Sequence, residues 1–498
     1  MKILLINPSL TAHISDIPSP EPPLGLAYIA AILEENNYEV KILDALALGS
    51  ENIVEKESFV HVGLDEKDIR KYIKNFSPQI VGISAAYTAY STDSHNCAQI
   101  VKNELPNSLV VFGGAHTSAS PDVVLIDNNI DIAVKGEGET TFLEIVKNYE
   151  NKTSLSNIPG TVVKKGSKIH INPSRPYISN LDSLPFPARH LLPMEKYLNK
   201  PSYLQDYSMR QPRTNMITSR GCPYSCVFCS IHSVWGRQWR PRSPKKVVDE
   251  IEYMKNTYGV KEIAFLDDNI SFDKKRMIQI CDELIKRKLD IKWCTPNGVY
   301  IKSIDLPLLK KMKDSGCWKL TFGIESGSID TQKFIGKVWN LDQCSKIIKQ
   351  ASSLGIWTHS TFMIGFPYET IESYQMTVQY AIKSDLDFAN FYIATPYSGT
   401  KLKNIFLKEK MLSKDNSSYK SINLPECDTK FFTRSELLEM QSNAYSKFIR
   451  SRILRPFRIL KKIKSFEDIK FTIKIARIAT SVSLTTKKSG SVQTHFKR

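Results

Sequence analysis

The sequence predicts an α/β protein with an N-terminal doubly wound parallel sheet, a partial (β/α)6 barrel of the TIM type, and a helical, basic C-terminal extension. Two observations support this fold class. Short, continuous apolar runs alternate with amphipathic helical stretches over residues 1–150 and again over 211–400. Buried parallel strands that are joined by helices have this pattern. The basic residues are concentrated in the last 49 positions of the chain.

Residues 1–150 are expected to form a Rossmann-like domain. Its predicted strands are Lys2–Asn7, Glu39–Leu43, Ile80–Ser84, Leu109–Phe112 and Ile132–Val134, and its predicted helices are Leu24–Glu35, Asp65–Asn75 and Ser91–Glu104. Ligands of such sheets bind at the carboxyl ends of the strands. Four loops there contain small residues, which let a backbone approach a bulky ligand closely. They are Pro22–Gly25, Ser84–Thr88, Gly113–His116 and Gly136–Glu139.

The proline-rich residues 151–210 predict a hairpin over Gly160–Ile171 and then an interdomain linker. Residues 211–400 repeat the strand–helix alternation, and 401–498 form the extension. The predicted barrel strands lie near Met216–Ser219, Glu262–Leu266, Lys292–Thr295, Lys319–Phe322, Trp357–Ile364 and Asp387–Ala394. Six such units in fewer than 200 residues indicate a partial barrel with its chemistry in the loops at the carboxyl ends of the strands.

The formal charge of +17 is spread unevenly. Residues 450–498 contain 14 Lys and Arg against Glu467 and Asp468, and the rest of the chain is nearly balanced. This distribution argues against a protein that coats nucleic acid with its whole surface. No run of about 18 uncharged apolar residues predicts a membrane-spanning helix. Nine cysteines without a signal-peptide pattern predict a reducing, cytoplasmic compartment.

Three of the nine cysteines stand together, directly after the first predicted barrel strand. Cys222, Cys226 and Cys229 have the spacing C-x3-C-x2-C. A zinc site normally has four ligands in two separated pairs, and no matching pair stands elsewhere in the sequence. Three thiolates on one loop instead suit a [4Fe–4S] cluster whose fourth iron takes a non-protein ligand.

This loop resembles the signature of the radical S-adenosylmethionine (SAM) superfamily. Residues 1 to about 400 resemble its subgroup with an N-terminal cobalamin-binding domain. The resemblance implies that Cys222, Cys226 and Cys229 bind the catalytic cluster and that the open iron takes SAM. Later motifs that match the family are Phe265–Asn269, Phe322–Gly327, Met363–Glu369 and Ala394–Thr400. The SAM contacts implied by the resemblance are Phe228, Asp268, Glu325 and Gly365.

The N-terminal loops resemble the family's cobalamin module. The cobalamin contacts implied by this resemblance are Gly25, Ser84, Gly113, Gly114, His116, Gly136 and Glu137. The sequence departs from the D-x-H-x-x-G pattern that supplies a lower-axial histidine in other cobalamin enzymes, since the early His13 does not stand in that pattern. The resemblance therefore implies a cobalamin without a histidine on cobalt, and a domain that binds no cobalamin stays an alternative.

The resemblance implies radical chemistry, in which a reduced cluster cleaves SAM to a 5′-deoxyadenosyl radical. We expect an anaerobic methyltransferase that uses cobalamin, acts on an unactivated carbon of a small or lipid-like metabolite, and receives electrons from a flavodoxin or ferredoxin. Two alternatives stay open: oxidative cyclisation of a tetrapyrrole, and a non-catalytic cobalamin or Fe–S sensor. tRNA methylthiolation is rejected, because those enzymes have a second cysteine trio and only Cys97 precedes Cys222 here.

The basic tail has two interpretations. Residues 450–464 and 471–482 mix basic with apolar side chains, so they could form an amphipathic cap on the barrel with solvated charges. The alternative is a basic helix on anionic lipid, which would place the protein at the inner face of the membrane. Nucleic acid is not expected as a partner, because the few aromatic residues are not interleaved as stacking platforms.

Overall fold

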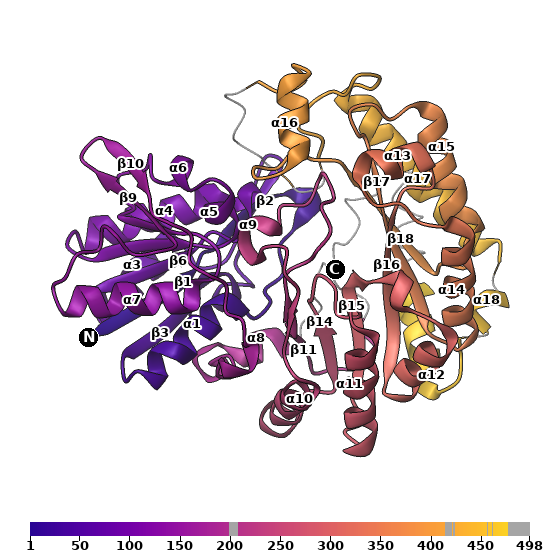
Figure 1. Cartoon of the computed structure of the whole chain (residues 1–498), viewed down its shortest axis with the longest axis horizontal. Coiled ribbons are helices and arrows are strands. Elements are labelled where there is room, and N and C mark those ends of the chain that lie inside the picture. The colour runs from indigo at the N-terminus through magenta and orange to yellow at the C-terminus, as the bar shows by residue number, and fades with distance from the viewer. Residues whose placement is uncertain (199–207, 414–420, 422–423, 456, 461, 477–498) are drawn as a thin grey trace.

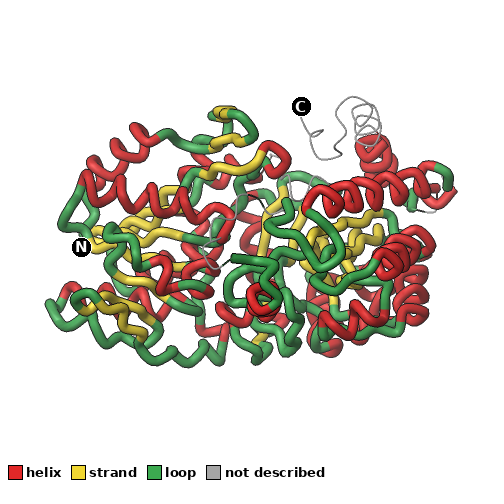
Figure 2. The backbone as a smooth tube through the Cα atoms, turned by 90° about the horizontal axis from the view of Figure 1, so that it is seen from above, coloured by secondary structure: helices red, strands yellow, loops and turns green. Residues whose placement is uncertain are grey.

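The computed structural model describes residues 1–198, 208–413, 421, 424–455, 457–460 and 462–476. Two α/β bodies lie side by side, the N-terminal one on the left of Figure 1 and the barrel on the right. Seen from above in Figure 2, helices flank the strands of both sheets. Part of the predicted linker (199–207) and the end of the basic tail (477–498) lie outside the described residues.

The N-terminal sheet has seven strands in the order β10-β9-β8-β7-β6-β1-β3. The five strands from β8 to β3 are parallel, and the predicted hairpin forms and extends this sheet antiparallel to β8. The strands are β1 (Lys2–Asn7), β3 (Glu39–Asp44), β6 (Ile80–Ser84), β7 (Leu109–Gly113), β8 (Ile132–Val134), β9 (Thr161–Lys165) and β10 (Lys168–Ile171).

Helices cover both faces of this sheet, which explains why its strands are apolar throughout. One buried cluster contains side chains of α1 (Leu24–Glu35) and α7 (Gly138–Glu150), and the other contains side chains of α3 (Glu66–Phe76) and α4 (Ser91–Glu104). The predicted doubly wound fold is therefore confirmed. The short helices are α2 (Ala45–Leu48), α5 (Ala115–Ala119) and α6 (Pro121–Val124).

A small antiparallel sheet, in the order β2-β5-β4, was not predicted. Each strand has four residues, and every residue of β4 is exposed. A strand this short and this exposed has no continuous apolar run to reveal it. The strands are β2 (Leu10–His13), β4 (Ile53–Lys56) and β5 (Phe59–Val62).

The barrel is an open sheet of six parallel strands in chain order. The strands are β11 (Arg213–Met216), β14 (Glu262–Phe265), β15 (Lys292–Val299), β16 (Cys317–Glu325), β17 (Trp357–Ile364) and β18 (Phe388–Ile393). The outer helices are α10 (Pro244–Tyr258), α11 (Lys274–Lys286), α12 (Leu306–Asp314), α13 (Ile329–Ile335), α14 (Leu341–Ser353) and α15 (Ile371–Lys383). The first strand ends at Met216, and β12 (Ser219–Arg220) instead pairs with β13 (Arg240–Pro241).

Side chains, rather than a further strand, cap both edges of the barrel sheet. At the β11 edge, Arg189 Nη2 donates to the carbonyl of Asn215 over 2.8 Å. At the β18 edge, the Phe391 N–H donates to Tyr445 Oη (3.1 Å) and the Phe391 carbonyl accepts from Gln441 Nε2 (2.7 Å). Both residues belong to α17 (Arg434–Ile453). The remaining helices are α8 (Met194–Leu198), α9 (His232–Trp235), α16 (Lys401–Lys408) and α18 (Phe457–Leu460).

The described part of the tail closes the barrel at the amino ends of its strands. The Phe471 ring packs against Trp318 and Trp357, with ring centroids 5.0 and 4.9 Å apart. Lys462 is fully buried, and its Nζ lies 2.7 Å from Asp387 Oδ2. The described part of the tail thus packs on the barrel as the cap interpretation expects, but Lys462 is buried and paired where solvated charges were expected. Among the described helices, none is long and apolar enough to cross a membrane.

Candidate active site

The cysteine loop follows β12 and is anchored at its centre. The Val227 N–H donates to the carbonyl of Ile335, and the Val227 carbonyl accepts from the Leu402 N–H (3.0 and 2.9 Å). The loop is thereby held between the end of α13 and the start of α16. Three thiols on this anchored loop are half-buried and not in disulfides: those of Cys222, Cys226 and Cys229.

These thiols fit an iron–sulfur cluster better than a single ion. Within the described part of the chain, no three His, Cys, Asp or Glu side chains converge as they would on one metal ion. Thiolates that bind different irons of one cluster lie farther apart than ligands of one ion, so this result does not exclude a cluster. Burial raises the pKa of all three thiols, that of Cys229 to about 12. A bound metal would hold them deprotonated.

Two adjacent aspartates after β14 have different roles. The buried Asp267 carboxylate accepts from the Thr218 N–H, the Thr218 hydroxyl and the Ser219 hydroxyl. It thus fixes the segment that leads into the cysteine loop. The Asp268 carboxylate makes no hydrogen bond or ion pair with any described residue. Burial, with the charge of Asp267 adding, raises the pKa of Asp268 to about 7. Asp268 is therefore the member of the pair that can receive a ligand.

Glu325 ends β16 in a strained conformation. Its φ of 66° lies in the left-handed region, and such strain in a non-glycine residue is typical of functional sites. Its carboxylate lies 2.8 Å from Lys337 Nζ and 3.3 Å from the Thr361 hydroxyl. Burial alone would lower the pKa of Lys337. The charges of Glu325 and of the Cys226 and Cys222 thiols have the larger effect, so the pKa of the lysine is raised. Lys337 therefore links Glu325 to the cysteine loop.

The turn after β17 lies beside Phe228. The rings of Phe228 and Phe366 are 6.3 Å apart between centroids. Gly365 has a φ of +81°, and a Cβ there would lie 2.9 Å from Leu437, so only glycine fits without displacement. The Gly365 N–H donates to Glu369 Oε2 over 2.6 Å. Burial raises the pKa of Glu369 to about 8. Phe228 therefore lies beside the turn that contains Gly365, and the SAM contacts of both residues stay predictions.

The carboxyl edge of the N-terminal sheet has open space in front of it. A Cβ added at Gly25 or Gly113 would meet no atom within 4 Å. Tyr87, in the loop after β6, keeps 58% of its surface exposed. These residues fit a large planar ligand such as cobalamin at this edge.

The other residues predicted at this edge are held by protein contacts. A Cβ at Gly114 would lie 2.6 Å from the carbonyl of Ala85, so this glycine serves the packing of two loops. Burial lowers the pKa of His116 to about 4, and its Nδ1 lies 3.1 Å from the Thr88 hydroxyl. The Ser84 carbonyl accepts from Ser94. The cobalamin contacts of Ser84, Gly114 and His116 stay predictions. His13, which was not expected to bind cobalamin, packs edge-on against Phe59 in the small sheet.

The Gly136–Glu139 loop is joined to the cysteine loop by buried ion pairs, which we call the junction: Arg220, Arg240, Glu137 and Glu139. Arg220 Nη1 lies 2.9 Å from Glu137 Oε1, and its Nη2 pairs with Glu139. Arg240 Nη1 lies 2.8 Å from Glu137 Oε1. All four side chains are at least 95% buried. Since Arg220 is two residues from Cys222, the junction ties the cluster loop to the N-terminal body.

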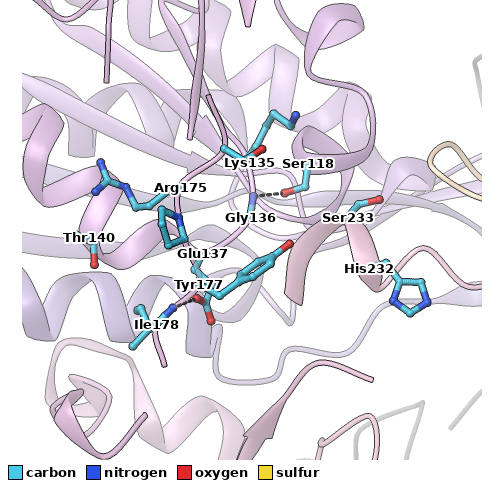
Figure 3. A pocket seen from close by; sticks show the side chains of 12 residues that line it. Ser118, Lys135, Gly136, Glu137, Thr140, Arg175, Tyr177, Ile178, His232 and Ser233 are labelled. Carbon is cyan, nitrogen blue, oxygen red and sulfur yellow. Dashed lines mark hydrogen bonds between the residues drawn. The ribbon is translucent and has the colours of Figure 1, made fainter. Parts of the chain in front are cut away.

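A cavity of about 320 Å³ lies beside the junction (Figure 3). This volume is at the lower end of the range for small-ligand pockets. Tyr177 points between Glu137 and α9, and Gly136 donates its N–H to the Ser118 hydroxyl over 3.0 Å. The lining residues are Ser118, Lys135, Gly136, Glu137, Thr140, Ser174, Arg175, Pro176, Tyr177, Ile178, His232 and Ser233.

Sequence reasoning missed the junction arginines and Lys337. Arg220 stands directly before the Gly-Cys of the cluster loop. Together with Glu137 and Glu139 earlier in the sequence, a basic residue at this position is a weak signal for an ion pair. Lys337 follows the glycine that ends α13, twelve positions after Glu325. Its position in the sequence does not reveal that α13 folds back over the loop.

Comparisons with known proteins agree with this arrangement. Two family profiles match: a B12 binding domain over residues 11–146 and the radical SAM superfamily over residues 216–381. The chain therefore belongs to the radical SAM enzymes that carry a B12-binding domain, and its cofactors are a [4Fe–4S] cluster, SAM and cobalamin.

Two relatives are similar over most of the chain. An uncharacterized methyltransferase of Pyrococcus horikoshii is 38% identical over 96% of this chain and 97% of its own length. A cytidylyl-2-hydroxyethylphosphonate methyltransferase of Streptomyces wedmorensis is 34% identical over 84% of each chain. The solved structure of the cobalamin-dependent SAM radical enzyme OxsB, with aqua-cobalamin and SAM bound, superposes with a TM-score of 0.71 at 17% identity. The superposition covers 99% of this chain and 74% of the OxsB chain. The two proteins therefore have the same fold.

Proposed function

We propose that this protein is a methyltransferase that transfers a methyl group to an unactivated carbon of a metabolite. The observation that carries the proposal is the junction, because Arg220 bonds the N-terminal body directly to the loop of Cys222, Cys226 and Cys229. Two cofactor sites that are locked together in this way can serve one reaction. The methyltransferase names of the two relatives support the same conclusion.

When bound, the cluster supplies the electron that cleaves SAM to a 5′-deoxyadenosyl radical, and cobalamin carries the methyl group. The three thiolates would bind the cluster, which would take SAM. Asp268 would accept a hydrogen bond from the polar end of SAM, and Glu325, oriented by Lys337, would accept one from its ribose. Phe228 would pack against the adenine beside the Gly365 turn.

The N-terminal edge would hold cobalamin between the two bodies. Gly25 and Gly113 would leave room for the ligand, and Tyr87 would face it. Ser84, Gly114, His116 and Gly136 would shape the loops around the nucleotide tail. The Glu137 side chain is taken up by the junction, so we assign its contact with cobalamin to the backbone.

We further propose a cytoplasmic one-electron donor of the flavodoxin or ferredoxin class, because the cluster must be reduced before it can cleave SAM. The described part of the basic tail is engaged by the barrel through Arg458, Lys462 and Phe471. This engagement favours the cap over the lipid-bound helix. Co-sedimentation with anionic liposomes that is lost on truncation at residue 450 would reverse that preference.

The test is an anaerobic incubation of the reconstituted holoenzyme with dithionite, methyl-labelled SAM and extract of the source organism. We expect both 5′-deoxyadenosine and labelled product, and neither with the Cys226→Ser variant. Release of 5′-deoxyadenosine without label transfer would favour oxidative cyclisation. No 5′-deoxyadenosine from protein with an intact cluster would favour the sensor and overturn the proposal.

A further inference from the structure

The barrel strands present polar side chains to the lumen. Along β17, residues at alternate positions are partly exposed, namely His359, Thr361 and Met363, while the residues between them are buried. Phe362 packs outward against Tyr380 of α15. Because successive residues of a strand point to opposite faces, the partly exposed set faces the barrel interior.

Four lumen side chains form a ladder across β16, β17 and β18: Thr321, His359, Asn390 and Tyr392. The Thr321 hydroxyl lies 3.1 Å from His359 Nδ1, and Asn390 Nδ2 donates to Tyr392 Oη over 2.8 Å. Asn390 acts on the pKa of the His359 ring, so the two hydrogen-bonded pairs lie next to each other. Burial, with nearby Lys319 adding, lowers the pKa of His359 to about 3. The ring is therefore neutral at physiological pH and offers one donor and one acceptor.

The opposite wall of the lumen is also polar. Asn215 Nδ2 donates to Glu21 Oε2 over 3.1 Å. Arg213 Nη2 lies 3.9 Å from Glu21 Oε1, and Arg213 Nε lies 3.7 Å from Glu262 Oε1. Glu21 belongs to the segment before α1, so the N-terminal body contributes to this wall. Its acidic and basic groups offset each other, which favours neutral polar groups over a concentrated charge.

The lumen is closed beneath this polar layer and faces the cofactors above it. Trp318, Trp357 and Phe471 pack together at the amino ends of the strands. Glu325 and the Gly365 turn end β16 and β17 at the opposite, carboxyl end. Because the floor is sealed and the strand exteriors are covered by helices, the exposed surface of the ladder belongs to an interior space.

We propose that this space is the substrate site and that it takes a water-soluble metabolite through its hydroxyl, amide or carbonyl groups. This inference rests on the proposed function and names its substrate class. A hydrocarbon or porphyrin face against the ladder would leave unsatisfied those donors and acceptors that the ladder does not use internally, which is unfavourable. A site built to hydrogen-bond its ligand rejects an analogue that lacks those groups strongly.

The labelled incubation tests this inference when SAM, methionine and cobalamin are first removed by chromatography and the remaining products are partitioned between water and chloroform. We expect the transferred label in the aqueous phase. Label in the chloroform phase would overturn the polar substrate class and leave methyl transfer standing. No label in either phase would overturn the proposed function, and this inference with it.

Variants of the lumen residues test whether these residues bind the substrate that receives the label. We expect His359→Leu and Asn390→Leu to lower label transfer tenfold or more relative to 5′-deoxyadenosine release, and His359→Gln to recover part of the loss. The matched control is His190→Leu, an exposed histidine of the linker, which should transfer label as the wild type does. Thermal unfolding and the EPR signal of the reduced cluster show that each variant is folded and loaded. Equal transfer by wild type and both leucine variants would overturn the assignment.

Discussion

Carboxylates on the two sides of the cysteine loop differ in burial and in pairing, since those of the junction are buried and Asp268 is half-buried. At the junction, Glu137 and Glu139 are both paired with arginines. On the cofactor side, Asp268 has no partner among the described residues, and its pKa is raised to about 7. A buried carboxylate that is paired holds structure together, whereas one that is desolvated and unpaired is kept for a ligand. Pairing therefore distinguishes the structural carboxylates of the junction from the carboxylate of the candidate SAM site.

The difference in pairing between these carboxylates has a direct energetic consequence. Removing one partner of a buried ion pair leaves an uncompensated charge and costs about 3–5 kcal/mol. Neutralising an unpaired, desolvated carboxylate removes an unfavourable charge instead. Substitutions at the junction should therefore act on stability, and substitutions on the cofactor side should act on binding.

The largest effect is expected on the cofactor side. Cys226→Ser should abolish cluster assembly and 5′-deoxyadenosine formation, because a serine hydroxyl is a poor ligand for iron. Iron content and the EPR spectrum of the reduced protein measure it. Cys97→Ala, a buried cysteine of α4, is the control and should keep the full cluster. An intact cluster in Cys226→Ser would show that the loop is not its site.

At the junction, Arg220→Gln should lower the free energy of unfolding by about 3–5 kcal/mol, since Glu139 and Glu137 lose a buried partner. Urea denaturation of the anaerobic protein measures this loss. The double variant Arg220→Glu, Glu139→Arg should recover part of it, which would reveal direct coupling. A loss below about 1 kcal/mol, typical of an exposed pair, would remove the distinction between the two sides.

Asp268→Asn should weaken SAM binding about tenfold, or about 1.4 kcal/mol, and leave the free energy of unfolding unchanged or raised. Equilibrium dialysis of the reconstituted protein measures the affinity. The neighbouring Asp267→Asn is the matched control, because its carboxylate accepts three hydrogen bonds. It should destabilise the fold. The reverse ranking of the two variants would contradict the roles assigned here.

The last prediction concerns the pH dependence of stability. Burial raises the pKa of Glu369 from 4.5 to about 8, so the folded state binds a proton that the unfolded state releases between these values. The contribution of Glu369 to stability should therefore fall as pH rises from about 5 to 8. In Glu369→Gln this contribution should disappear, and the unfolding midpoint should depend less on pH. An identical pH profile in both proteins would contradict a buried, titrating Glu369.

Sequence reasoning succeeded where the signal is local. Continuous apolar runs located β1, β6, β8 and β17 to the residue, and helical periodicity located α1 and α4. The cysteine trio needed only its spacing. The junction was beyond reach, because Arg220 and Glu137 are 83 positions apart and meet only after both bodies have folded. The lumen ladder was hidden for the same reason, since register between three strands decides which polar residues face each other.

The side chains that cap β11 and β18 leave the six-stranded sheet without a closing ladder. In a closed barrel the number of strands and their stagger fix the diameter. Here Arg189, Gln441 and Tyr445 satisfy the edges separately, so within the described part of the chain no strand pairing sets the gap between the edges. Evolution can therefore widen or narrow the lumen by changing loops and the Glu21 segment, and one scaffold can adopt new substrates while its cofactor chemistry stays in place.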